Sequence, residues 1–314
     1  MCIGSIPEEA NMIIHCRIFL LLLAALLTTG CSVRRFAINK LGDALASSGT
    51  TFSSDDDPDL IRGATPFSLK LIESLLAETP RHRGLLFAAS SNFTQYTYAF
   101  VHEDADEAED QDIDKALALR ARARRLYVRA RNYGLRGLEV RYPDFGKAIR
   151  ANPKAAVALT KASDVPLLYW TAASWGLAIS VSKDQPDLIA DQPQVEALID
   201  RALELDEDYD FGAIHGFLVT YESSRLTGKG DFAERSRKHF ERAMELSGGK
   251  QAAPLVSLAE IVSVSKQNRK EFESLLNKAL AIDPDSKPEW RLSNLVAQRR
   301  AHWLLNRTDR LFVE

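Results

Sequence analysis

The chain has 314 residues, of which 46% are hydrophobic and 26% charged, an ordinary globular composition that suffices for one large or two modest domains. Its formal net charge of −3 excludes a general electrostatic attraction to nucleic acid or anionic lipid. Glycine and proline are sparse, at 16 and 12 residues, and the sequence has no sustained apolar-polar alternation with hairpin turns. We therefore expect an almost entirely helical protein.

The first element in chain order is an apolar block of ten residues at 18–27. A helix needs about 20 apolar residues to span a bilayer, so this short block and the small residues that follow it indicate a cleaved export signal over residues 1–30. Two glutamates near the start are unusual for the positively charged beginning of such a signal. Translation is therefore expected to begin at Met12.

Cys31 follows these small residues directly. The arrangement resembles the lipobox of bacterial lipoproteins, in which the cysteine is acylated and becomes the first residue of the mature chain. The alternative is a lone buried cysteine beside an ordinary signal peptide. Because Ser32 rather than aspartate comes next, the resemblance implies attachment to the periplasmic face of the outer membrane. Cys31 would be the one cysteine of the mature chain, so no intramolecular disulfide is expected.

Residues 31–58 are interpreted as an anchor-proximal amphipathic segment and a loop that ends in a helix start at Pro58, and residues 59–314 as a single helical domain. In this domain apolar residues recur at intervals of three and four, and the breaks fall at prolines and paired glycines, where a helix does not continue easily. The expected helices cover residues 67–78, 81–102, 112–140, 167–182, 194–205, 209–224, 231–246, 253–264, 269–281 and 289–306.

Three of these helices end on a similar run, such as Arg-Ala-Leu-Glu-Leu-Asp at residues 201–206. The alanine of this run recurs at Ala202, Ala243 and Ala279, 41 and 36 residues apart, against about 34 in the tetratricopeptide repeat. The predicted fold is all-α, with stacked antiparallel helix pairs forming a divergent tetratricopeptide-like superhelix. Each pair buries its apolar face against its neighbours and leaves a concave surface, which favours binding over catalysis.

Aromatic residues are the first candidates for a binding site. Tyr169, Trp170 and Trp175 lie on one expected helix, but Trp170 and Trp175 point about 140° apart, so other helices must complete any pocket. Phe93 and Tyr96 belong to a similar stripe on an earlier helix. Both groups either pack between neighbouring helices or line an internal apolar cavity.

Polar segments supply the remaining candidates. The acidic stretch 102–112 is interpreted as a solvated loop and helix N-terminus, with calcium binding as the alternative, although it lacks the Asp-x-Asp-x-Asp-Gly pattern. Seven arginines on the next helix form either a charged outer face or a docking surface for an acidic partner. His215 is interpreted as a core histidine or a ligand contact. Because the sequence has no nucleophile elbow, zinc motif or phosphate loop, we expect no enzymatic activity, metal or cofactor.

A resemblance to a known family is carried by residues 168–170 with 175–176, 240–249, 288–292 and 298–304. From residue 31 to residue 312 the chain resembles the T component of TRAP-type transporters, a family of tetratricopeptide-like periplasmic lipoproteins. The resemblance implies an accessory subunit that forms homo-oligomers, as a trimer, and binds the extracytoplasmic solute-binding protein (the P component). It also implies a cavity for an apolar or amphipathic ligand, and no catalytic residues.

Two other functional classes remain open. An outer-membrane or cell-envelope assembly scaffold would use the same repeats to bind protein segments, and a genomic neighbourhood without solute-binding and permease genes would favour it. A hydrolase acting on envelope polymers would require converging carboxylates or a histidine-centred triad in the folded cavity.

Overall fold

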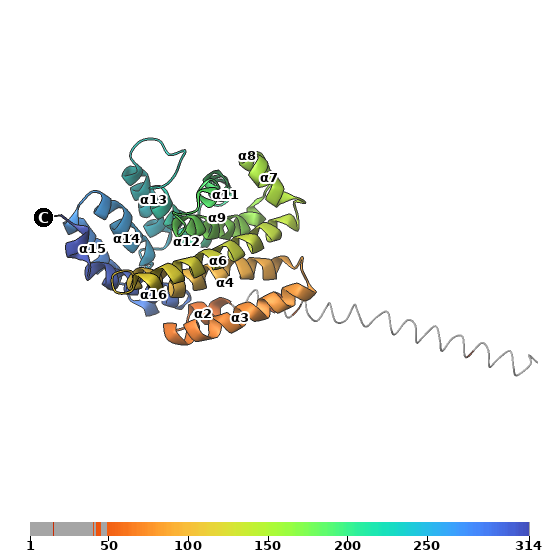
Figure 1. Ribbon diagram of the computed structural model, residues 1–314, viewed down its shortest axis with the longest axis horizontal. Helices are drawn as coiled ribbons and strands as arrows, with labels where there is room; N and C mark the ends of the chain where they lie inside the picture. The colour runs from red at the N-terminus through yellow and green to blue at the C-terminus, as the bar shows by residue number, and fades with distance from the viewer. Residues whose placement is uncertain (1–14, 16–39, 41, 45–48, 314) are drawn as a thin grey trace, which may run out of the picture.

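The computed structural model describes residues 15, 40, 42–44 and 49–313 (Figure 1). Cys31, Met12 and all but one residue of the expected signal peptide lie outside the described residues, so acylation, cleavage and the start site stay predictions. The described part of the chain is helical and contains no strand, which confirms the all-α prediction. None of its helices is both long enough and apolar enough to cross a bilayer.

Consecutive helices pack in antiparallel pairs (Figure 1). Their order is α2 (Gly49–Ser53), α3 (Pro58–Glu78), α4 (Arg83–Thr97), the π-helical turn η1 (Tyr98–His102), α5 (Glu103–Ala108), α6 (Ile113–Glu139), α7 (Phe145–Ala151), α8 (Pro153–Ala158), η2 (Ala162–Asp164), α9 (Val165–Ser180), α10 (Pro186–Ile189), α11 (Gln192–Leu205), α12 (Tyr209–Tyr221), α13 (Phe232–Leu246), α14 (Ala253–Leu258), the π-helical turn η3 (Ala259–Ser263), α15 (Arg269–Leu280), η4 (Pro284–Ser286), η5 (Pro288–Trp290), α16 (Arg291–Leu305) and α17 (Thr308–Leu311).

Several helices begin where a polar side chain satisfies the first free backbone N–H groups. The Asp57 carboxylate accepts from the amides of Asp59 and Leu60 and starts α3. Asp112 and Asn268 cap α6 and α15 in the same way. These caps place the starts of α6 and α15 within one residue of the positions expected from the apolar spacing.

Other expected boundaries were wrong. Helix α3 begins at Pro58, where a helix start was expected and where Asp57 caps it, but it runs on to Glu78 without the expected new start at residue 67. Pro66 is tolerated inside the helix, because burial of residues such as Leu69 opposes the loss of one hydrogen bond. The expected loop before it contains α2. The segment 145–158 was not expected to be helical, but it forms α7 and α8.

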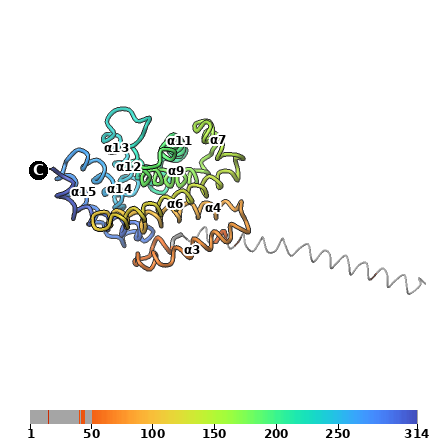
Figure 2. Tube along the Cα trace, in the orientation of Figure 1, coloured from red at the N-terminus to blue at the C-terminus, as the bar shows by residue number. Residues whose placement is uncertain are grey.

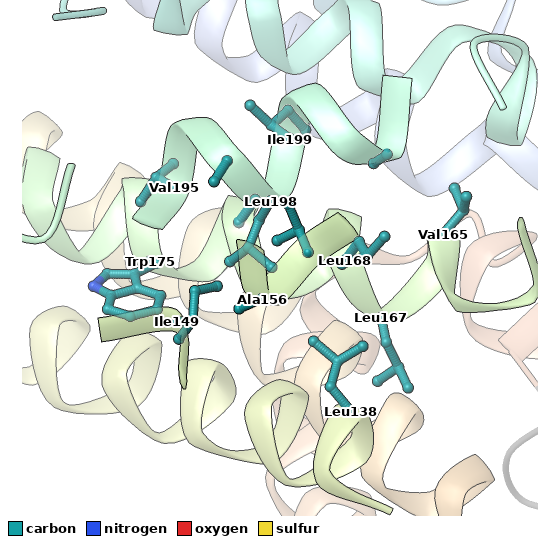
Figure 3. Packing of buried hydrophobic residues seen from close by; sticks show 14 of the residues in the cluster. Leu138, Ile149, Ala156, Val165, Leu167, Leu168, Trp175, Val195, Leu198 and Ile199 are labelled. Carbon is teal, nitrogen blue, oxygen red and sulfur yellow. The ribbon is translucent and has the colours of Figure 1, made fainter. Parts of the chain in front are cut away.

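The core consists of three adjoining clusters of buried apolar side chains. One lies among α6, α9 and α11, where Leu138, Leu168 and Leu198 are fully buried (Figure 3). The second joins α3, α4 and α6, and the third joins the helices from α12 to α16. Burial of a leucine side chain contributes about 1.5–3 kcal/mol, so the apolar stripes seen in the sequence account for the stacking of the helix pairs.

Helices α4, α6 and α9 approach one another closely at Gly134. A Cβ atom at this position would lie 2.1 Å from Thr171 Oγ1 and 3.0 Å from Ser90 Oγ. Ser90 and Thr171 are both buried. The centre of the fold therefore requires glycine at residue 134.

The superhelix closes on itself. Helix α16, near the C-terminus, contacts α2 and α3 from the opposite end of the domain (Figure 2). Arg291 Nη1 donates to the backbone oxygen of Ser54 at 2.8 Å. The first and last helices of the described chain thus form a seam, and the arrangement is a closed ring of helix pairs.

Candidate functional site

The acidic stretch forms one side of the seam between the two ends of the domain. Arg299 Nη2 lies 2.8 Å from Asp104 Oδ1, and Arg310 Nη1 lies 2.6 Å from Asp110 Oδ2. Glu103, at the start of α5, is only 2% exposed. The expectation of a solvated loop was wrong for residues 102–108, which are helical and bind arginines from the far end of the chain. Residues 109–112 form an exposed turn that leads to the acidic N-terminus of α6, as expected.

Arg300 lies at the centre of the seam. Its Nη1 atom is 3.2 Å from Glu103 Oε2 and 3.0 Å from Asp106 Oδ2. Its Nη2 atom is 2.5 Å from Glu260 Oε1, and its guanidinium carbon lies 4.2 Å from the ring centroid of Trp303. We call Arg300, Glu103, Asp106 and Glu260 the Arg300 cluster.

The Arg300 cluster holds three carboxylates around one guanidinium. Burial raises the pKa of Glu103 to about 7, and the neighbouring Glu260 adds to the rise although Arg300 opposes it. Burial lowers the pKa of Arg300, but the attraction of Glu260 and Glu103 outweighs this effect and leaves that pKa above its ordinary value. Two π-helical turns, η1 and η3, adjoin the cluster; such turns are frequent at functional sites.

Sequence reasoning missed the Arg300 cluster, although α16 contains a signal for it. Ala297, Arg300, Ala301 and Leu304 follow the spacing of three and four, and all are buried. An arginine on the apolar face of an amphipathic helix requires a buried acidic partner. The partner's identity was not visible, because Glu103 is 197 residues away.

Tyr98, in η1, has a partly exposed side chain and a desolvated hydroxyl group. The side chain is 39% exposed. Burial raises the pKa of its hydroxyl well above the usual range, and the negative charge of Glu103, to which the hydroxyl is hydrogen-bonded, adds to the rise. Tyr98 therefore lies partly exposed beside the Arg300 cluster.

The structure brings two of the expected aromatic residues together with a third. The ring centroids of Tyr169 and Trp170 lie 5.0 Å apart, and those of Tyr169 and Tyr209 lie 5.5 Å apart. All three residues are partly buried, and burial raises the pKa of Tyr169 above its usual value. We call these three residues the aromatic cluster. Tyr209, at the start of α12, had not been singled out from the sequence.

Trp175 lies elsewhere and is fully buried. Its Nε1 atom donates to Asp191 Oδ2 at 3.1 Å. The guanidinium groups of Arg131 and Arg150 lie 4.8 and 5.7 Å from its ring centroid. Its surroundings are those of a side chain packed between helices.

Phe93 and Tyr96 also lie in the packed region around α4. Phe93 is buried and stacks on Tyr133, with ring centroids 6.0 Å apart. The hydroxyl of Tyr96 accepts from Arg122 Nη2 at 3.3 Å. The structure does not bring these two residues into contact with the aromatic cluster.

His215, the remaining expected residue, is buried and pairs with His239 of α13. Their Nδ1 atoms lie 2.9 Å apart, so one nitrogen donates and the other must be unprotonated to accept. Burial lowers the pKa of both rings, that of His239 to about 4. His239 also borders a pocket of about 280 Å³, together with Glu222 and Arg235. The spacing of Ser236 and Ala243 places residue 239 near the buried face of α13, but this spacing does not indicate that His239 meets His215.

The described residues contain no group of three or more metal-ligating side chains arranged to hold an ion. What they form is a closed arrangement of stacked helix pairs with a buried ion cluster, which defines the chain as an all-α helical-repeat protein. The model of the TRAP transporter T-component family matches residues 54–312, and the chain belongs to this family.

A protein of Treponema pallidum (strain Nichols), described only as uncharacterized, is 27% identical over 309 residues. The similarity covers 93% of this chain and 96% of the relative. Family membership indicates an accessory component of a TRAP transport system, a class that is not known as an enzyme.

Proposed function

We propose that the chain is a periplasmic lipoprotein that binds the extracytoplasmic solute-binding protein of a TRAP system and holds an apolar or amphipathic ligand inside its helical ring. The observation that carries this proposal is the family match, which covers nearly the whole described domain. The ligand-binding part is supported by the partly exposed rings of Tyr98 and the aromatic cluster, because aromatic surface of this kind can pack against an apolar ligand.

The proposal includes acylation at Cys31, attachment to the periplasmic face of the outer membrane and assembly as a homotrimer. Acylation and attachment rest on the sequence around the export signal. The trimer rests on the resemblance to the family. An anchored subunit would hold the solute-binding protein near the membrane and raise its local concentration there.

Affinity purification from native membranes tests this function. The full chain carries a C-terminal tag, and an unrelated outer-membrane lipoprotein with the same tag is the control. We expect a TRAP solute-binding protein to be enriched with this chain and not with the control. Recovery of envelope-assembly proteins without any solute-binding protein would contradict the proposal and favour the scaffold function.

A further inference from the structure

One end of the domain carries a local excess of positive charge. Between residues 136 and 161 the sequence has six lysines and arginines against two carboxylates, although the net charge of the whole chain is −3. This segment contains the end of α6 and all of α7 and α8. Figure 1 shows α7 and α8 at one end of the domain, and α15 with the C-terminus at the opposite end. The positive charges are therefore gathered at the end that lies far from the C-terminus.

The connection between α3 and α4 joins the same surface. Arg81 Nη2 donates to the backbone oxygen of Val140 at 3.2 Å, just after α6. In the opposite direction, Arg136 Nη2 donates to the backbone oxygen of Pro80 at 3.1 Å. The exposed cations of this end, which we call the basic end face, are Arg81, Arg136, Arg141, Lys147, Lys154 and Lys161.

Few carboxylates neutralise the basic end face. Asp164 is fully buried and is shared by Arg83 and Arg141, so one carboxylate serves two guanidinium groups. Asp144 pairs with Lys147 at 2.9 Å. In the part of the chain that the structure describes, the cations of the face without a carboxylate within 4.0 Å are Arg81, Arg136, Lys154 and Lys161.

The segment that leads from Cys31 reaches the domain beside the basic end face. Asp43 Oδ1 lies 3.4 Å from His82 Nε2, and His82 lies between Arg81 and Arg83 in the sequence. Cys31 precedes Asp43 by 12 residues, a length of chain that spans about 40 Å at most. An acyl anchor at Cys31 therefore keeps the start of α4, and the basic end face with it, close to the membrane surface.

An exposed leucine lies among these cations. Leu159, after the end of α8, is 66% exposed. The next residues are held in place, because Arg201 Nη2 donates to the backbone oxygen of Thr160 at 2.9 Å and the backbone N–H of Lys161 donates to Asp164 at 3.0 Å. Basic side chains beside an exposed apolar side chain are typical of surfaces that lie on anionic lipid.

We propose that the basic end face lies on the anionic phospholipid surface of the membrane that holds the chain. This inference rests on the proposed lipoprotein function and adds the orientation of the domain. The anchor supplies proximity, and the free cations supply orientation, because each lysine or arginine near an anionic membrane strengthens binding by about fivefold. The opposite end of the domain, with α15, then points away from the membrane.

Chemical labelling of lysines tests the orientation on the full chain reconstituted into vesicles. One set of vesicles contains phosphatidylcholine alone, and the other contains equal parts of phosphatidylcholine and phosphatidylglycerol. The rate of acetylation of each lysine is measured by mass spectrometry. We expect Lys147, Lys154 and Lys161 to react at least about threefold more slowly on the anionic vesicles. High salt should abolish this protection, because it screens the attraction.

Two double variants sharpen the test. Lys154→Gln with Lys161→Gln removes two cations of the basic end face. Lys270→Gln with Lys278→Gln, in α15, is the matched control, because these lysines are also exposed and form no ion pair in the described part of the chain. We expect the protection of Lys147 to fall at least about twofold in the first double variant and to stay at the wild-type level in the control.

Three results would overturn the inference. The first is equal acetylation of Lys154 and Lys161 on the two kinds of vesicle, and the second is unchanged protection of Lys147 in the first double variant. The third is protection that appears only when the solute-binding protein is added, which would assign the basic end face to a protein partner. The mass of the peptide that contains Cys31 reports acylation separately, so a failure of the proposed anchor is distinguished from a failure of the proposed orientation.

Discussion

Removal of the Arg300 side chain tests the seam more strongly than any other single substitution. Arg300→Met leaves Glu103 buried beside Asp106 and Glu260 without its guanidinium partner. Breaking a buried ion pair by removing one partner costs about 3–5 kcal/mol. We expect the free energy of unfolding to fall by an amount in this range at pH 8.

The loss should depend on pH. Arg300 opposes the rise in the pKa of Glu103, which burial already brings to about 7, so its removal raises this pKa further. Consider pH values between the pKa of Glu103 in the folded wild type and its higher pKa in folded Arg300→Met. In this window Glu103 is ionised in the folded wild type, whereas in the folded variant it holds a proton that it loses on unfolding. The stability difference therefore grows by about 1.4 kcal/mol for each pH unit in this window, and it is smaller at pH 6 than at pH 8.

Urea denaturation followed by circular dichroism at pH 6 and pH 8 measures both effects. Arg242→Met is the control, because Arg242 also pairs with three carboxylates but at a more exposed site, where the expected cost is below about 1 kcal/mol. The double variant Glu103→Gln with Arg300→Met should recover part of the loss and its dependence on pH. A loss below about 1 kcal/mol for Arg300→Met at both pH values would refute this reasoning.

Two further predictions concern stability. Gly134→Ala should lower the free energy of unfolding by about 1–3 kcal/mol through overpacking against Thr171. Gly63→Ala, which has open space at its Cβ position, should raise the free energy of unfolding by about 0.5–1 kcal/mol. Equal shifts of the two variants in thermal melts would argue against close packing at Gly134. The pKa of His239 falls from 6.5 to about 4 on folding. The contribution of neutral His239 to the free energy of unfolding is therefore complete above pH 6.5 and is lost as the pH falls through 4. This loss of stability, up to about 3 kcal/mol, should be smaller in His239→Gln. Identical pH profiles of the free energy of unfolding for the wild type and His239→Gln would contradict a neutral His215–His239 pair.

The helices were predictable where burial follows the local period. In α13 and α15 the spacing of three and four and a polar cap fix the helix, and both ends lie within one residue of the expected positions. The aromatic cluster was partly predictable for the same reason, because Tyr169 and Trp170 lie on a strongly apolar helix. Tyr209 was missed, since its role depends on how α12 packs beside α9.

The seam could not be predicted from local patterns. Asp104 and Arg299 are 195 residues apart, and single-sequence periodicity contains no information about which helices meet. The acidic stretch therefore resembled a solvated segment until its partners were known. The left-handed residues of α12 were hidden for a different reason, because Asp210 and Phe211 favour other conformations and only the surrounding structure holds them.

Binding between purified partners tests the central claim most directly. The full chain in detergent is titrated with the TRAP solute-binding protein encoded in the same genome, and the heat of binding is recorded. The account predicts saturable binding with one solute-binding protein for each chain. The absence of measurable binding, with both proteins shown to be folded, would contradict it.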